Sequence, residues 1–329
     1  MEIVVLKFGG TSFKKLNNDP HILKHINNYI ERGFIPVVVV SAMGRKGAPY
    51  STDTLIRQLE KIHPKINPKT KDLIMSCGET ISASVVSHLL EANNIPSEPL
   101  MGFQAGIITD NTFNSAEILT IDISTIKSLM DMGKVVVVAG FQGMTENKEI
   151  TTLGRGGSDI TAIALGGYLK AKRVDIFTDV PGVAFIDPKM VPETKFIDNI
   201  SYKNMYILSS KGVKVIHPKA VKMAEKFNIP VRITSTYLNE PGTLISSKGS
   251  KEKIIGIAIK TIDDKSSFTI LYDNQFAKSL LPYLRDFFKE NKEDILDIHF
   301  NKGEIALMVS NEASTPFANN LYAYLNNIA

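Results

Sequence analysis

Near the beginning of the chain, a lysine and two glycines follow directly after a short apolar run. The run occupies residues 3–6, and residues 7–12 read KFGGTS. Glycines let the main chain approach an anion without a Cβ in the way, and a helix that begins after such a loop adds its positive end. A Walker loop is excluded, because there the lysine follows the glycines. Lys7, Gly9 and Gly10 therefore indicate a phosphate site, although the two glycines alone are more typical of a tight strand-to-helix turn.

A second glycine-rich loop, TTLGRGGSD at residues 151–159, also precedes a predicted helix. Ser158 or Asp159 is typical of a helix cap, which is the simpler interpretation of the end of this loop. Arg155, between glycines, is poorly explained by capping, because a planar guanidinium suits a bidentate contact with a carboxylate or a phosphate. Two such loops that face each other across a transferring phosphoryl group would perform phosphoryl-transfer chemistry.

A third segment, TDVPGV at residues 178–183, follows a predicted strand. Asp179 stands at the carboxyl end of that strand, where open α/β sheets bind their ligands. Lys211 and Lys214 precede a His-Pro pair, and either lysine is a candidate contact for a nucleotide bound at the end of this strand. A turn explains the Pro-Gly pair of this segment by itself, so the segment is a weak signal when it is taken alone.

The composition favours a protein that binds small anions rather than nucleic acid. The 329 residues carry a formal net charge of +4, and the basic residues are scattered rather than gathered in one stripe. Cys77 is the single cysteine, which excludes an internal disulfide framework and fits a reducing compartment. We recognise no signal peptide and no apolar stretch long enough to span a bilayer, so we expect a cytoplasmic protein without a membrane partner.

A parallel sheet is expected to position these motifs. Short runs that are apolar throughout, rather than alternating, are typical of strands covered on both faces, and amphipathic segments lie between most of them. We therefore predict an α/β fold, a three-layer α/β sandwich with a mostly parallel sheet. The predicted strands are residues 3–6, 35–40, 135–139, 174–178 and 231–233, and the predicted helices are residues 20–32, 52–61, 79–92, 123–132, 158–169, 201–210 and 218–227.

The pattern changes after residue 246. Residues 247–253 are polar and flexible in composition, as in a linker. We therefore predict a first domain at residues 1–246, a linker at 247–253 and a small α+β domain at 254–329, which is marginal in size for independent stability. Its predicted strands are residues 254–259, 268–271, 295–299 and 304–309, and its predicted helices are residues 275–289 and 315–326.

Taken together, the motifs resemble the aspartokinase branch of the amino acid kinase superfamily. The similarity extends over residues 1 to about 246, in the family's order and at its spacing. The combination of KFGGTS with TTLGRGGSD is highly specific. The other matching motifs are VVVVSAMG at residues 37–44, CGE at 77–79, GFQG at 140–143, TDVPGV at 178–183, KVIHP at 214–218 and EPGTLI at 240–245.

The resemblance implies an aspartate kinase that uses ATP and Mg²⁺ to phosphorylate the β-carboxylate of L-aspartate, the entry step to lysine, threonine and methionine. A β-carboxylate has a pKa of about 3.9, so it is ionised at neutral pH and needs no general base. Such an enzyme has to align two anions and neutralise their repulsion. That is a task for lysines, backbone N–H groups and Mg²⁺.

The resemblance also implies roles for individual residues. Lys7 would hold the transferring phosphate and Asp159 would orient the metal-bound phosphate, so these two are the expected catalytic residues. Glu79 would accept hydrogen bonds from the α-ammonium of aspartate, and Arg155 would bind its α-carboxylate. The other expected substrate contacts are Ser41, Thr52 and Ser158, and the other expected nucleotide contacts are Gly9, Gly10, Thr178, Asp179, Phe185, Lys189 and Lys214. No side chain is predicted to be a dedicated metal ligand.

Three positions depart from the family pattern. Ala184 stands where an aromatic residue is usual, so Phe185 would supply the wall for adenine one place later. Asn204 and Thr234 replace a usual acidic residue and a frequent arginine. Two alternatives stay open: a kinase for another small amino acid such as glutamate, because the ammonium and carboxylate contacts serve any α-amino acid, and a non-catalytic amino acid sensor of the same fold.

The C-terminal domain resembles the ACT modules in which aspartokinases commonly end. Four strands and two helices suffice for one module, in a rotated order that puts the early strand 254–259 in the fourth place. A single small module leaves a sheet edge or an apolar face bare, so we predict a homodimer through this domain. ACT effector sites have Asp-x-Pro-Gly before the first helix, whereas residues 272–276 read YDNQF, so we expect no tight binding of lysine or threonine.

Overall fold

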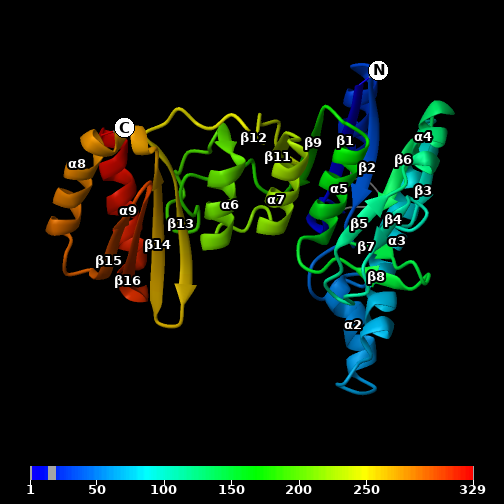
Figure 1. The fold of residues 1–329 in the computed structure, drawn as a ribbon, viewed down its shortest axis with the longest axis horizontal. Helices are drawn as coiled ribbons and strands as arrows, with labels where there is room; N and C mark the ends of the chain where they lie inside the picture. Colours follow the sequence, from blue (N-terminus) through cyan, green and yellow to red (C-terminus); the bar gives the residue numbers. More distant parts are fainter. Residues whose placement is uncertain (1, 14–19, 329) are drawn as a thin grey trace. The chain divides into compact units, whose positions relative to one another are not determined.

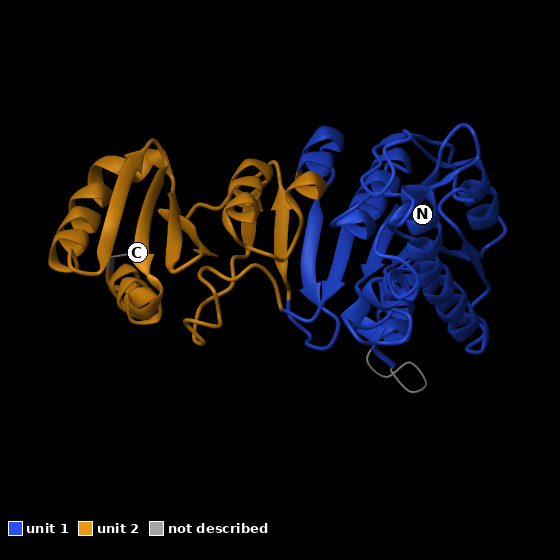
Figure 2. Cartoon of the chain, turned by 90° about the horizontal axis from the view of Figure 1, so that it is seen from below, with its two compact units in different colours: residues 1–180, 222–240 blue, residues 181–221, 241–329 orange. Residues whose placement is uncertain are grey.

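The computed structural model describes residues 2–13 and 20–328, and the chain forms two compact units (Figures 1 and 2). The first unit comprises residues 1–180 and 222–240, and the second comprises residues 181–221 and 241–329. Residues 247–253, the predicted linker, form no helix or strand. The division of the chain into domains at residues 246 and 254 stays a prediction.

The core of the first unit is a parallel sheet whose strands follow the order β11-β9-β1-β2-β6-β3. The five apolar runs form the predicted parallel strands: β1 (Glu2–Phe8), β2 (Phe34–Val40), β6 (Val135–Ala139), β9 (Arg173–Thr178) and β11 (Val231–Ser235). The edge strand β3 (Ser97–Leu100) was not predicted, because its sequence, SEPL, has no apolar run. Phe8 pairs with Val40 on one side and with Phe177 on the other, so these three strands end at the same edge.

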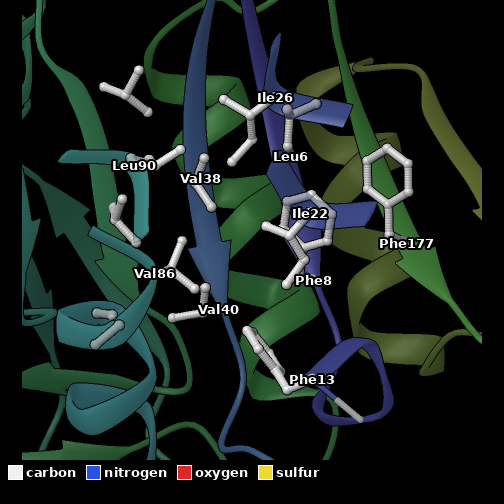
Figure 3. Packing of buried hydrophobic residues seen from close by; sticks show 14 of the residues in the cluster. Leu6, Phe8, Phe13, Ile22, Ile26, Val38, Val40, Val86, Leu90 and Phe177 are labelled. Atoms are coloured by element: carbon white, nitrogen blue, oxygen red, sulfur yellow. The ribbon is translucent and has the colours of Figure 1, made fainter. Parts of the chain in front are cut away.

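Helices cover both faces of this sheet, which confirms the predicted sandwich (Figure 1). On one face, the side chains of β1 and β2 form a core cluster with those of α1 (Pro20–Glu31) and α3 (Pro68–Glu91) (Figure 3). Residues alternate between the faces of a strand, so Val5 and Lys7 of β1 point toward α5 (Gly157–Tyr168) on the opposite face. The other helices of this unit are α2 (Thr52–Glu60) and α4 (Ser124–Asp131), and α7 extends over Pro218–Phe227.

Helix α3 is longer than predicted, because it begins at Pro68 rather than at residue 79. Asn67 caps it by accepting a hydrogen bond from the Lys69 N–H at 3.0 Å, and proline is favoured at the first helical position. By length and composition α3 is able to cross a membrane, which differs from the sequence expectation. Half of that stretch is buried inside the protein, and Asp72 and Glu79 are buried on it, which is typical of a core helix.

A small second sheet in the first unit has the order β5-β4-β7-β8. Its strands β4 (Ile107–Thr109), β5 (Ile118–Ile121), β7 (Gln142–Met144) and β8 (Ile150–Thr152) are three or four residues long. They were not predicted, because such short strands show little periodicity. The sheet matters for the site, since β8 leads directly into the second glycine-rich loop.

The second unit contains a short parallel pair and a separate antiparallel sheet. Strands β10 (Asn199–Ser201) and β12 (Thr243–Ser246) form the pair, and α6 (Tyr202–Lys211) follows β10. The antiparallel sheet has the order β13-β14-β16-β15. Its elements are β13 (Ile254–Ile262), β14 (Lys265–Tyr272), η2 (Asn274–Phe276), α8 (Ala277–Glu290), β15 (Ile295–Asn301), β16 (Glu304–Ser310) and α9 (Asn311–Ile328).

All four strands and both helices predicted for the tail are therefore present. In a ferredoxin-like unit the chain runs βαββαβ. Here β14, α8, β15, β16 and α9 supply the first five elements in order, and β13 pairs with β14 in the place of the last strand. This arrangement is the rotated order that the sequence predicted.

Candidate active site

Lys7 of β1 forms an ion pair with the first turn of α5. Its Nζ lies 2.8 Å from Asp159 Oδ1, and the two side chains are only 11% and 13% exposed. Among the described residues this oxygen accepts no well-aligned hydrogen bond, so the contact is ionic and leaves the ammonium free to turn toward another anion. A Cβ on Gly9 would lie 3.5 Å from Lys7 Nζ, which places the ammonium over the glycine loop.

The KFGG loop and the SAMG loop pack directly against each other. A Cβ on Gly10 would lie 2.5 Å from Ala42 O and 2.6 Å from Gly44 O, so a side chain at this position is excluded. The Gly44 N–H donates to Gly10 O at 3.0 Å, and the Ser41 N–H donates to Phe8 O at 3.1 Å. The glycine at position 10 is therefore required for the close approach of two loops.

Gly9 requires a correction. Its N–H donates to Phe177 O at 3.2 Å, so it is not available for a phosphate as predicted. The physical reason is that the pairing of β1 with β9 continues for one residue beyond the strand. A Cβ on Gly9 would make only ordinary contacts, at 3.5 Å from Lys7 Nζ and 3.6 Å from Phe177 O, so packing does not require glycine here. The donor role of Gly10 stays a prediction.

Glu79 is a buried carboxylate on α3 with one unpaired oxygen. Its side chain is 3% exposed, and Oε1 accepts a hydrogen bond from the Ala42 N–H at 3.0 Å. Oε2 accepts none from the described residues. Burial raises the pKa of Glu79 to about 8, against the Ala42 hydrogen bond and the nearby charge of Lys7, which lower it. A buried, unpaired carboxylate oxygen is suited to a ligand that brings its own positive charge.

The raised pKa of Glu79 predicts a specific pH dependence of stability. In the folded protein the carboxyl binds its proton more tightly than in the unfolded chain, so its contribution is fully present below about pH 4.5 and is lost as pH rises through about 8. We expect Glu79→Gln to melt at a higher temperature than the wild type at pH 8.5 but not at pH 5. His25, whose pKa is lowered by burial, has the opposite dependence and is common to both proteins, so the difference isolates Glu79. An equal difference at both pH values, measured by calorimetry, would contradict the assignment.

Arg155 lies in the second glycine-rich loop, between two residues with left-handed backbone angles. Gly154 has φ = +71° and Gly156 has φ = +73°, which only glycine adopts without strain. Gly156 stands at the N-cap of α5, so Arg155 comes immediately before the positive end of that helix. The guanidinium is exposed, whereas the flanking Thr152 and Ser158 are buried. The loop thus has one exposed cationic side chain between these buried residues.

Ser41, Thr52 and Ser158 also lie in the first unit. Ser41 follows the last residue of β2, and Thr52 is the first residue of α2. Ser158 is 8% exposed, and a Cβ on Gly140 would lie 2.9 Å from its Cβ, so this serine packs closely against the chain after β6. Their contacts with a substrate stay predictions.

Thr178 and Asp179 lie at the carboxyl end of β9, next to the end of β1. The Thr178 hydroxyl donates to Asp179 Oδ1 at 3.2 Å, and Arg45 of the loop after SAMG forms an ion pair with the other Asp179 oxygen. Arg45 is 72% exposed, so this pair is worth about 1 kcal/mol or less and is easily exchanged for another anion. A second cation, with an exposed side chain, therefore lies at the same edge of the sheet as Lys7.

Phe185, Lys189 and Lys214 lie in the second unit. Lys189 and Lys214 are exposed. Phe185 is 4% exposed, and its ring centroid lies 6.0 Å from that of Tyr322 of α9. Its backbone is also committed, since its N–H donates to Lys195 O at 2.9 Å. Such burial favours core packing over the predicted stacking on adenine, because the ring presents almost no surface to a ligand.

Residues 2–235 match the family model described as the amino acid kinase family. This match extends over most of the chain and includes every glycine-rich loop described above. The chain belongs to the amino acid kinase family.

Relatives within the amino acid kinase family include named aspartokinases. The chain is 44% identical to Aspartokinase 1 of Bacillus subtilis over 252 residues, which is 77% of this chain and 62% of that protein. It superposes on a crystal structure of aspartate kinase from Synechocystis with a TM-score of 0.67 and 31% identity, covering 97% of this chain and 54% of the other. E. coli aspartokinase III, in complex with aspartate and ADP, gives a TM-score of 0.65 at 25% identity, with coverages of 95% and 80%. The chain thus spans less than two thirds of the length of the first two relatives.

Two residues at this amino acid kinase site were not predicted from the sequence. The contact of Arg45 could not be predicted from a local pattern, because its partner Asp179 is 134 residues away. Asp72, which is fully buried, accepts hydrogen bonds from residues 42 and 80 positions later. Its position seven residues before Glu79 on a helix was a usable signal, but the predicted helix began too late to include it.

The burial of Phe185 leads to a prediction about stability. We expect Phe185→Ala to lower the stability of the second unit by about 3–5 kcal/mol, as for other phenylalanines removed from a core. The measurement is thermal unfolding, with Phe196→Ala as a matched control, because Phe196 is 39% exposed. Unchanged stability together with a weakened affinity for ATP would instead support the predicted stacking of Phe185 on adenine.

Proposed function

We propose that this chain catalyses the ATP-dependent phosphorylation of the β-carboxylate of L-aspartate. The observation that carries the proposal is the unpaired Glu79 Oε2, buried beside the loop that packs on Gly10. It is a site for an ammonium group, and the Lys7–Asp159 pair is close enough for Lys7 to affect the pKa of Glu79. An α-amino acid is the ligand class that brings an ammonium, a carboxylate for Arg155 and a second carboxylate for transfer.

The chemistry requires charge neutralisation more than proton transfer. Lys7 would hold the transferring phosphoryl group, and its exchangeable ion pair with Asp159 allows it to do so. Arg45 would exchange Asp179 for a nucleotide phosphate in the same way. Aspartate and ADP are bound in the E. coli relative, which supports the same pair of ligands here.

Mg²⁺ fits this site as a partner of the nucleotide rather than as a fixed part of the protein. Among the described residues no group of three or more histidine, cysteine, aspartate or glutamate side chains is placed to bind a metal. Mg²⁺ in kinases is held by phosphate oxygens, water and one or two carboxylates. Asp159 Oδ1 would be such a carboxylate oxygen if Lys7, which lies 2.8 Å from it, turned toward a phosphate. The ion would neutralise charge on the phosphates.

ADP release in the presence of a panel of amino acids tests the proposed function. We expect turnover with L-aspartate and little with three analogues. L-Glutamate has a longer side chain, D-aspartate has the opposite configuration at Cα, and N-acetyl-aspartate lacks the ammonium group. A preference for glutamate would show that the substrate is another acidic amino acid. Absence of turnover with the whole panel, in protein that still binds aspartate, would favour the sensor alternative.

We also propose that the protein is a homodimer through the antiparallel sheet of the tail. Strand β15 is an edge strand of that sheet, and Leu296 and Phe300 on it are 54% and 39% exposed. Such an edge is usually covered in a stable protein. We expect light scattering to give twice the 36.3 kDa mass of the chain, and a monomer at micromolar concentration would contradict this proposal.

The turn before α8 supports the proposal that the tail does not bind an amino acid effector. Asp273 Oδ1 accepts the Gln275 N–H at 3.0 Å, and the Gln275 side chain donates to Asp273 Oδ2 at 2.9 Å. The turn is thus satisfied by its own side chains, with no glycine to admit a carboxylate. Inhibition of activity by submillimolar lysine, threonine or methionine would contradict the proposal.

A further inference from the structure

Asp72 of α3 is a buried carboxylate without a cationic partner among the residues that the structure describes. Its side chain is fully buried, and its two oxygens accept hydrogen bonds from two other segments of the chain. The Thr152 hydroxyl donates to Oδ1 at 2.7 Å, and the Thr152 N–H donates to Oδ2 at 2.9 Å. The Asn114 N–H donates to Oδ2 at 2.9 Å and lies 3.1 Å from Oδ1. The carboxylate thus joins three parts of the first unit.

The two segments that Asp72 holds form the base of the loop that carries Arg155. A Cβ on Gly154 would lie 3.0 Å from Asn114 O, so the loop rests directly on the Asn114 backbone. Thr152 O accepts the Ala116 N–H at 2.9 Å, which ties the same two segments together a second time. The Arg155 side chain beyond this base is exposed. The backbone of the loop that carries Arg155 therefore rests on segments that converge on Asp72.

Helix α3 links this base to Glu79. Asp72 and Glu79 are seven residues apart, which is two helical turns and about 10 Å along the axis, on one face of the helix. One helix thus carries both Glu79, the proposed ammonium contact, and Asp72, which holds the base of the Arg155 loop. In the proposed site this helix would help to set the distance between the ammonium contact and the carboxylate contact.

We propose that Asp72 is a positioning residue that holds Arg155 at the distance from Glu79 required by an α-amino acid. The inference deepens the proposed function and rests on it for the identity of the ligand. Asp72 acts through Arg155 and touches no substrate. Its replacement is expected to weaken the binding of the α-carboxylate equally in the ground state and in the transition state.

The kinetic test is a double-mutant cycle. In Asp72→Asn the side-chain amide faces a backbone N–H, so at least one of the hydrogen bonds is replaced by a contact between two donors. We expect the KM for aspartate to rise about tenfold, with kcat and the KM for ATP within about twofold of the wild type. In an Arg155→Ala background, the same change is expected to alter the KM for aspartate by less than about twofold, because its target is already gone. Full additivity of the two effects would overturn the proposal.

Milder variants keep the test informative if Asp72→Asn does not fold. Thr152→Val removes one donor to Asp72 and is expected to raise the KM for aspartate in the same direction, whereas Thr152→Ser keeps the hydroxyl and restores the wild-type value. Ser87→Ala is the matched control, since it removes a buried hydroxyl of α3 that is paired with Ser97 at 2.8 Å. It should leave the KM for aspartate unchanged. An equal rise in Ser87→Ala would show a general loss of packing.

Hydrogen exchange supplies a readout that does not depend on activity. We expect Asp72→Asn and Thr152→Val to speed the exchange of peptides that contain residues 150–158, and Ser87→Ala to leave these peptides unchanged. Unchanged exchange of this loop in both variants would overturn the inference, whatever the kinetics. An inactive wild-type protein would refute the proposed function alone, because the exchange result would still decide whether Asp72 anchors the loop.

Discussion

Replacing Lys7 by alanine is expected to lower kcat by about 10²–10³-fold, the usual cost of removing one preorganised electrostatic contact from an active site. Lys7 Nζ is the cation over the glycine loop, and its only described ionic partner is Asp159, whose Oδ1 accepts no aligned hydrogen bond from the described residues. In the proposed reaction its charge would matter most as negative charge shifts onto the bridging oxygen in the transition state. The loss should therefore appear in kcat more than in the KM for aspartate.

Lys172→Ala is the matched control for Lys7→Ala. Lys172 is 48% exposed and pairs with Glu2 at 2.6 Å, at the other end of the strands from the glycine loop. Its removal should leave kcat unchanged and alter stability by about 1 kcal/mol at most. Steady-state assays of both variants at saturating ATP measure kcat and the KM for aspartate. A normal kcat in Lys7→Ala would show that Lys7 has no catalytic role.

Replacing Arg155 by alanine is expected to raise the KM for aspartate by about 10–100-fold while kcat changes little, because hydrogen bonds to a charged group are worth about 1.5–3 kcal/mol. In the proposed reaction the α-carboxylate does not react, so Arg155 would bind it equally in the ground and transition states. Arg155→Lys should recover only part of the loss, since an ammonium does not form the bidentate contact. An unchanged KM for aspartate in Arg155→Ala would contradict the assignment.

The sheet could be predicted because its strands are apolar throughout. In β2 and β6, runs of valine leave little alternative to a strand covered on both faces. The edge strand β3 and the three-residue strands of the small sheet could not be predicted in this way. Their structure comes from pairing with partners far along the chain, which a local pattern does not record.

The sequence indicates candidate site residues where a residue type matches one chemistry. Lys7 before two glycines and Arg155 between glycines are such cases, and their roles stay predictions. Long-range packing could not be predicted: the Gly9 N–H is occupied by the pairing of β1 with β9, and Phe185 is buried next to Tyr322 of α9. Asp72 could not be predicted because its hydrogen-bond partners, Asn114 and Thr152, are distant in the chain.

In the proposed reaction one acidic amino acid is held by its ammonium and α-carboxylate so that its distal carboxylate receives the phosphoryl group. The direct measurement is to trap the acyl phosphate with hydroxylamine and identify the hydroxamate by mass spectrometry and NMR. We expect aspartate β-hydroxamate, formed only with L-aspartate and ATP and abolished in Lys7→Ala. An α-hydroxamate, or ADP release without any hydroxamate, would contradict it.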